Sequence, residues 1–119
     1  MKVDGGVGWD LATVAAQAQE LEEMGNSGIT SAETSHDPFL PLAFAAQQTS
    51  RVDLITGIAV AFARTPMILA NIGHDLNAAS NGRFVLGLGS QIRAHITKRF
   101  SMPWSSPAAR MREFILALR

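Results

Sequence analysis

Residues 54 to 60 read Leu-Ile-Thr-Gly-Ile-Ala-Val, and this short run decides the fold. It carries no charge and is rich in β-branched residues, which is typical of a strand buried on both faces. Strands of this kind belong to parallel sheets that are covered by helices. We therefore predict a parallel strand over residues 54–60.

Helical patterns flank this strand on both sides. On its C-terminal side, Thr65-Pro66 forms an N-cap and first-turn pair for a helix that Asn81-Gly82 ends. On its N-terminal side, Pro38 and Pro41 fit the opening of another helix. The same alternation continues outward, which predicts further strands over residues 2–4, 28–33 and 84–88 and further helices from Asp10 to a stop at Gly25 and from Ser106-Pro107 onward.

Four strand–helix units predict a parallel sheet built from right-handed crossovers. The strands recur roughly every 26–30 residues, close to the repeat of a (β/α)8 barrel of about 250 residues. The predicted fold class is therefore α/β, the N-terminal half of a TIM barrel, in one domain over residues 1–119. A small open doubly wound sheet, complete at this length, is the alternative. The last helix runs to Arg119 without a stop signal, so we expect truncation after the fourth strand and helix.

Composition excludes several classes of function. The 119 residues contain no cysteine, which excludes disulfides, thiolate metal sites and a cysteine nucleophile. Ten basic and ten acidic residues cancel, so nothing in the charge points to nucleic acid or to a membrane surface. The N-terminus lacks the apolar region of a signal peptide, and the apolar stretch 54–63 is too short to span a bilayer. We expect a soluble, cytoplasmic protein.

Candidate site residues gather in Ser31–Pro38, which reads SAETSHDP and joins a predicted strand to a predicted helix. Function collects at the carboxyl ends of strands in parallel α/β folds, and Glu33 falls at such an end. Burial beside an apolar ring would suit Glu33 to acid–base work. The alternative is that Glu33 caps a helix or pairs with Arg64 or Arg93.

The neighbours of Glu33 have simpler interpretations. His36 is a candidate to face the substrate, whereas Asp37 followed by Pro38 is more simply a helix start. Glu33, His36 and Asp37 also offer metal-ligand groups, but no fourth ligand is evident and the spacing has no fixed geometry, so we predict no metal site.

The glycines do not form a dinucleotide fingerprint. Gly6-Val7-Gly8 and Gly87-Leu88-Gly89 both lack the third glycine of that motif, so we discount a Rossmann site. Gly57 is unusual inside an apolar strand, because glycine weakens a strand unless the backbone geometry needs it. The glycines of Gly87–Ser90 fit the close approach of a ring to the backbone, and tight strand–helix packing is the alternative.

Three stretches together carry a family resemblance: DGGVGWDLATVAAQAQELEEMG (residues 4–25), TSAETSHDPFLPLAFAAQQTSRVDLITGIAVAFARTPMILA (30–70) and NGRFVLGLGSQI (81–92). The chain resembles the luciferase-like monooxygenase superfamily, and most closely its deazaflavin (coenzyme F-420)-dependent oxidoreductases. The resemblance implies the N-terminal part of a (β/α)8 barrel. Such enzymes bind F-420 or FMN at the carboxyl ends of the strands, and transfer hydride to, or activate oxygen for, small organic substrates.

The resemblance also implies roles for particular residues. Glu33 would lie near the cofactor ring, and Gly57-Ile58 would form a non-prolyl cis peptide that backs the ring. Gly89, Ser90 and Gln91 would border the same pocket. Two departures leave the proton donor or acceptor open: Thr34 stands where some F-420 enzymes have histidine, and Gln91-Ile92 stands where some have glutamate. We therefore expect F-420 as cofactor, with FMN as the alternative, since the phosphate site of the family comes largely from later strands.

The connection Gln91–Pro107 is the longest in the chain. Ile92, Ile96 and Phe100 share helical spacing, which predicts a short helix lying over the barrel mouth. As a lid, its Arg93 and Arg99 would contact an anionic cofactor tail or substrate.

Three functions remain open from the sequence. They are an oxidoreductase of the luciferase-like class, a catalytically inactive remnant of such an enzyme, and a small complete α/β binding domain. Half a barrel exposes an apolar inner layer, so we expect a homo-oligomer or dependence on a missing C-terminal half.

Overall fold

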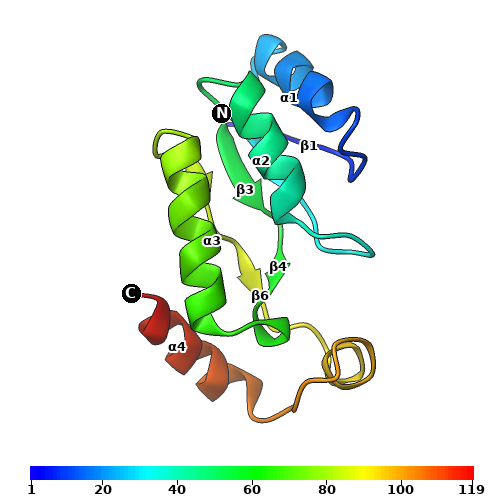
Figure 1. Ribbon diagram of the computed structural model, residues 1–119, viewed down its shortest axis with the longest axis vertical. Helices are drawn as coiled ribbons and strands as arrows, with labels where there is room; N and C mark the ends of the chain where they lie inside the picture. The colour runs from blue at the N-terminus through cyan, green and yellow to red at the C-terminus, as the bar shows by residue number, and fades with distance from the viewer.

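The chain alternates strands and helices throughout residues 1–119, all of which the computed structural model describes (Figure 1). The principal elements are β1 (Asp4–Gly6), α1 (Val14–Glu23), β2 (Gly28–Ser31), α2 (Phe39–Gln48), β3 (Asp53–Thr56), β4 (Ala59–Val60), α3 (Pro66–Ala79), β5 (Phe84–Val85), β6 (Leu88–Gly89) and α4 (Pro107–Leu118). Short helical segments lie at Ala61–Ala63 and His95–Arg99. No helix combines the length and the apolarity needed to cross a membrane.

All strand pairing is parallel. The main sheet has the order β1-β2-β3-β5, and β4 pairs with β6 in a second, two-stranded sheet. A doubly wound sheet reverses its strand order and carries helices on both faces. Here the order follows the chain, so successive crossovers run in the same direction, as in the first units of a (β/α)8 barrel. The predicted α/β fold class is confirmed.

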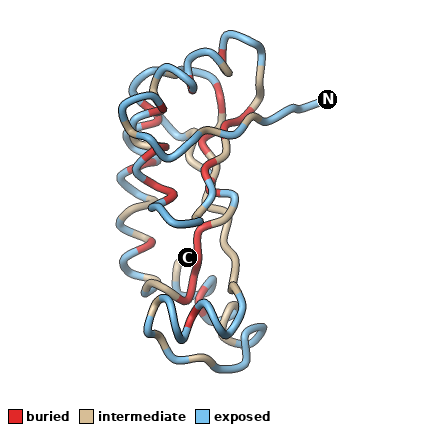
Figure 2. The backbone as a smooth tube through the Cα atoms, turned by 90° about the vertical axis from the view of Figure 1, so that its right-hand side faces the viewer, coloured by how far each residue is buried: buried red, intermediate tan, exposed pale blue.

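Only one face of the main sheet is covered by helices (Figure 2). Residues in register on parallel strands share a face, and the helix-covered row consists of Gly5, Ile29, Leu54 and Phe84. Ile29 and Leu54 are fully buried against α1 and α2. The opposite row consists of Gly6, Thr30, Ile55 and Val85, of which Val85 is 46% exposed. This open face corresponds to the interior of a closed barrel.

The strand predicted over residues 54–60 is not continuous, which corrects the sequence prediction. It breaks at Gly57-Ile58, whose peptide bond is cis, as the resemblance implied. The strand predicted over residues 84–88 breaks at the same level, between β5 and β6. Thr56 bridges the two breaks, because its hydroxyl donates to Gly87 O (2.9 Å) and accepts from Gly87 N (2.8 Å).

Three element ends also differ from the prediction. β1 runs from Asp4 to Gly6, so it lies two residues beyond the predicted range 2–4. β2 ends at Ser31, which leaves Glu33 in the loop beyond the strand. α1 begins at Val14 rather than directly after Asp10, which accepts from Ala12 N through its side chain (3.0 Å) and from Val14 N through its carbonyl (3.0 Å) in the turn that leads into the helix. Short polar side chains satisfy nearby backbone groups in turns as readily as at helix starts.

The predicted helix stops are confirmed. Gly25 has φ +88°, and Gly25 N and Asn26 N donate to Glu22 O and Leu21 O, which is the Schellman arrangement. Asn81, with φ 55°, and Gly82 end α3 in the same way. At the start of α3, the Thr65 hydroxyl accepts from Ile68 N (3.3 Å), as expected for an N-cap.

Replacing Gly87 with alanine is expected to destabilise the chain by about 1–3 kcal/mol, because the new methyl group would overlap the carbonyl oxygen of Thr56. Gly73→Ala is the matched control. It lies inside α3, where a methyl group would make an ordinary contact with Phe84 (3.7 Å), so we expect unchanged or slightly higher stability. Urea unfolding of both variants measures the difference, and equal stabilities would contradict the expectation.

Candidate active site

The carboxyl ends of the strands bring together most of the predicted site residues. Glu33 N donates to Ile58 O (3.1 Å), which joins the end of β2 to the break after β3. Gly89 pairs with Val60, and a Cβ on Gly89 would lie only 2.6 Å from Ile58 Cδ1. Gly57 is exposed, and Ser90 and Gln91 continue the chain directly beyond Gly89.

The carboxylate of Glu33 is buried and paired. Its side chain is 5% exposed, and its Oε2 accepts from Val60 N (2.6 Å) and from Arg64 (2.8 Å). Its Oε1 accepts from the other terminal nitrogen of Arg64 (2.9 Å). Of the alternatives that the sequence left open, pairing with Arg64 is the one present in the structure. The guanidinium also donates to Val60 O (3.1 Å), so Glu33 and Arg64 together hold β4 in place.

Asp37 extends this network to α2. Its Oδ1 accepts from Phe39 N (2.7 Å) and Leu40 N (2.9 Å), which confirms Asp37-Pro38 as a helix start. Its Oδ2 lies 3.5 Å from Arg64, and the Arg64 guanidinium lies 5.2 Å from the centre of the Phe39 ring. The segment after β2 is therefore fixed to both β4 and α2.

His36 lies apart from this network. Its ring stacks on Trp9, with the ring centres 4.1 Å apart and the planes 10° from parallel. Trp9 was not among the residues predicted from the sequence to belong to the site. The available signal was its position in the loop that follows the first strand, on the edge where function collects in this fold.

The connection after β6 contains the predicted short helix. His95–Arg99 forms a helical segment of π type, and Ile96 is fully buried while Arg93 and Arg99 are exposed. The side chains of Gln91 and His95 lie 3.1 Å apart. The action of this segment as a lid stays a prediction. No group of three or more His, Asp or Glu side chains lies close enough together to hold a metal ion.

The open face of the sheet suits one side of a planar ring. A Cβ on Gly57 would lie 3.6 Å from Thr30, and a Cβ on Gly6 would lie 3.7 Å from Thr30, which are ordinary contacts. No neighbour therefore occupies the space that a side chain at either position would take. Both glycines leave bare backbone beside Thr30. The residues present thus fit the ring of a flavin or deazaflavin.

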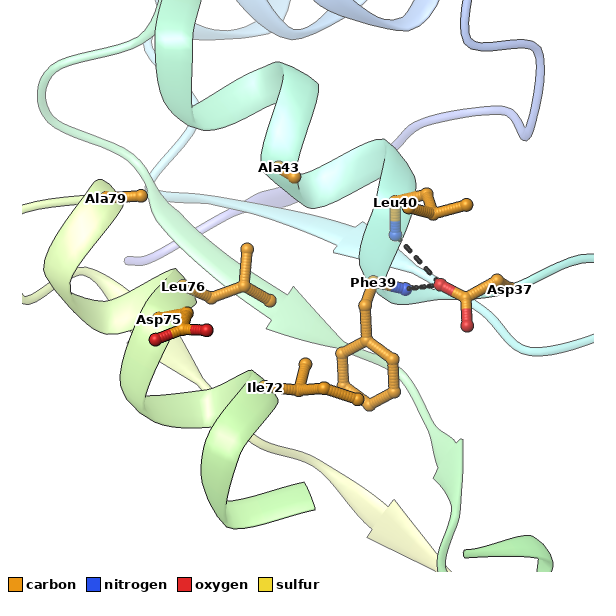
Figure 3. A pocket seen from close by; sticks show the side chains of 8 residues that line it. All are labelled: Asp37, Phe39, Leu40, Ala43, Ile72, Asp75, Leu76 and Ala79. Atoms are coloured by element: carbon orange, nitrogen blue, oxygen red, sulfur yellow. Dashed lines mark hydrogen bonds between the residues drawn. The ribbon is translucent and has the colours of Figure 1, made fainter. Parts of the chain in front are cut away.

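A cavity of about 470 Å³ lies on the helix-covered side of the sheet, between α2 and α3. Figure 3 shows Phe39 and Ile72 side by side at one end of it, with Asp37 beyond Phe39 and Asp75 on α3. The cavity is mainly apolar, and Asp37 at one end of it belongs to the network around Arg64. Its size alone does not make it the reaction site, because active sites of barrels lie at the carboxyl ends of the strands.

A parallel sheet covered on one face, with polar side chains at its carboxyl edge, is the arrangement of the first units of a (β/α)8 barrel. A family model described as luciferase-like monooxygenase matches residues 2–119, so the chain belongs to the luciferase-like monooxygenase family.

Individual relatives agree with this assignment. The chain is 60% identical to the uncharacterized protein Rv1360 of Mycobacterium tuberculosis over all 119 residues, which are 35% of that protein. It is 33% identical to the putative coenzyme F420-dependent oxidoreductase Rv3520c of the same organism, covering 82% of this chain and 28% of the relative. Among solved structures, the monooxygenase RslO1 of Streptomyces bottropensis superposes with a TM-score of 0.86 at 26% identity, covering 99% of this chain and 42% of that one. The chain thus spans about a third of the length of the curated relatives it matches.

Proposed function

We propose that this chain supplies the ring-binding part of an oxidoreductase of the luciferase-like class that uses coenzyme F-420. The proposal rests on the convergence of Glu33, Ile58 and Gly89 at the carboxyl edge of the strands. A relative named as F420-dependent supports the deazaflavin, and FMN is the second candidate. When bound, a deazaflavin supplies hydride transfer, and a flavin supplies hydride transfer or oxygen activation, on a small organic substrate.

In this proposal, the chain's own residues position the ring. Gly57-Ile58 lies behind it, and Gly89, Ser90 and Gln91 border it. Glu33 was predicted as a catalytic residue, but its two oxygens are occupied by Arg64 and Val60 N, which favours a positioning role. His36 remains the candidate to face the substrate.

Binding of F-420 tests the proposal. We expect the chain to bind F-420 or FMN, and we expect Gly89→Ala to weaken that binding by about tenfold, because the added methyl group displaces Ile58. Gly73→Ala, inside α3 and away from the strand ends, should bind as the unmodified chain does. Titration followed by absorbance and fluorescence gives the affinities.

Gel filtration alongside the titration distinguishes the proposed oxidoreductase from the two alternative functions. A soluble dimer that binds one cofactor supports the proposed oxidoreductase. Aggregation without binding supports an inactive remnant, and a stable monomer that binds neither cofactor supports a small α/β binding domain.

A further inference from the structure

Trp9 and His36 form a stacked pair at the carboxyl edge of the sheet. They lie in two different loops, one following β1 and one following β2, yet their rings are 4.1 Å apart and nearly parallel. Although His36 covers one side of the indole, Trp9 is still 59% exposed. A large aromatic side chain that is stacked on one side and open on the other has a free face for a further ring.

A small cavity lies beside this pair. Its volume is about 230 Å³, and Trp9 forms part of its wall together with Val7, Gly8, Ser31, Ala32, Thr34 and Asp37. The wall thus combines apolar surface with the hydroxyl groups of a serine and a threonine, which are hydrogen-bond donors suited to a carbonyl oxygen. A mainly apolar cleft with a few polar groups is the usual form of a small-molecule site.

The loop that carries Trp9 is held from both sides. Gly8 N donates to the side-chain oxygen of Gln17 on α1 (3.1 Å), and Val7 N donates to Thr30 O on β2 (3.0 Å). Ala12 N donates to Asp10 just beyond Trp9 (3.0 Å). The indole is therefore presented on a fixed backbone, which lowers the entropic cost of binding a ligand against it.

The acidic groups of this edge are already occupied. Glu33 is paired with Arg64, and Asp37 caps α2 through Oδ1 and faces Arg64 through Oδ2. Neither carboxylate is free to select a cation, so the recognition left to this cavity is stacking and hydrogen bonding by hydroxyl groups.

We propose that Trp9 and His36 form an aromatic platform that binds a planar, conjugated carbonyl compound, with the ring against the indole and the carbonyl toward Ser31 and Thr34. This inference rests on the proposed function, because it assigns a substrate class to the same carboxyl edge of the sheet. Trp9 and His36 are not among the residues proposed to border the cofactor ring, so binding to the platform is measured with no cofactor present. Failure of the platform and failure of cofactor binding are therefore separate results.

Acetophenone and cyclohexyl methyl ketone are suitable probes, because they share the carbonyl and differ in having a planar or a saturated ring. The chain has two tryptophans, so its ¹⁵N spectrum should contain two indole N–H signals, and Trp9→Phe assigns them. We expect acetophenone to shift the Trp9 signal, and to bind at least about threefold more tightly than the saturated ketone, in line with the modest energy of an aromatic contact. Trp104, which packs edge-on against Phe62, serves as the internal control.

Variants of Trp9 and His36 distinguish ring stacking from other roles of these two side chains. Trp9→Ala is expected to weaken acetophenone binding by about tenfold and to leave the Trp104 signal in place, which reports that the fold is intact. His36→Ala should weaken binding less, and His36→Phe should restore it, because phenylalanine keeps the stack without a titratable group. Equal affinity for the two ketones, a shift of Trp104 instead of Trp9, or unchanged binding by folded Trp9→Ala would each overturn the proposal.

Discussion

Replacing Arg64 with methionine is expected to lower the free energy of unfolding by about 3–5 kcal/mol. The change leaves the Glu33 carboxylate, 5% exposed, without the guanidinium that contacts both its oxygens. A buried charge that loses its partner keeps the cost of its lost hydration, and here only Val60 N would remain to donate to it. Urea unfolding at neutral pH measures the loss.

A double-mutant cycle shows whether this loss belongs to the pair. Glu33→Gln keeps an acceptor for Val60 N and removes the charge. The loss of unfolding free energy in the double variant Glu33→Gln with Arg64→Met should therefore be about 1–3 kcal/mol smaller than the sum of the two single-variant losses. Arg93→Met is the matched control, because Arg93 is exposed and should change stability by less than about 0.5 kcal/mol. Single-variant losses that add within about 0.5 kcal/mol would show that the two residues are not coupled.

The same pair shows how far the sequence could predict the site. The position of Glu33 just past a strand marked it as a candidate, because the carboxyl ends of parallel strands share one edge. Its partner lies 31 positions further along the chain, and sequence spacing offered Arg64, Arg93 or a helix cap equally. Hydrogen bonds from Gly57 N to Ser31 O and from Glu33 N to Ile58 O join the end of β2 to the segment before β4, and the fold thereby brings Arg64 within 2.8 Å of the carboxylate.

Helix ends were more predictable than strand ends, for a physical reason. Gly25 and Asn81-Gly82 stop helices through backbone geometry that few other residues adopt, so the local sequence specifies the stop. The break at Gly57-Ile58 lies within an apolar run, where pattern alone does not distinguish one strand from two short ones. Only the family resemblance predicted the cis bond. Neither the resemblance nor the sequence pattern predicted that the Thr56 hydroxyl, at the break between β3 and β4, bonds to Gly87 at the break between β5 and β6.

Glu22 is a second buried carboxylate, and it lies at the opposite end of the strands from Glu33. It is 9% exposed and sits near the end of α1, where its Oε2 accepts from the main-chain N–H groups of Ser50, Arg51 and Val52 just before β3. Burial by itself raises the pKa of Glu22, but these N–H groups and the nearby Arg51 charge outweigh it and hold that pKa below its ordinary value of 4.5. In a barrel, the amino-terminal end of the strands serves stability more than chemistry.

Replacing Glu22 with glutamine is therefore expected to cost about 2–3 kcal/mol at pH 7, because three main-chain donors lose a charged acceptor. Since folding lowers the pKa of Glu22, its contribution is complete above pH 4.5 and is lost as the pH falls through the lower, folded-state value. The unfolding free energies of the two proteins should consequently converge in acid. Glu23→Gln, on the exposed side of the same helix, should change stability by less than about 0.5 kcal/mol at either pH. A Glu22→Gln deficit that persists unchanged at low pH would mean that packing of the side chain, rather than its charge, joins α1 to the start of β3.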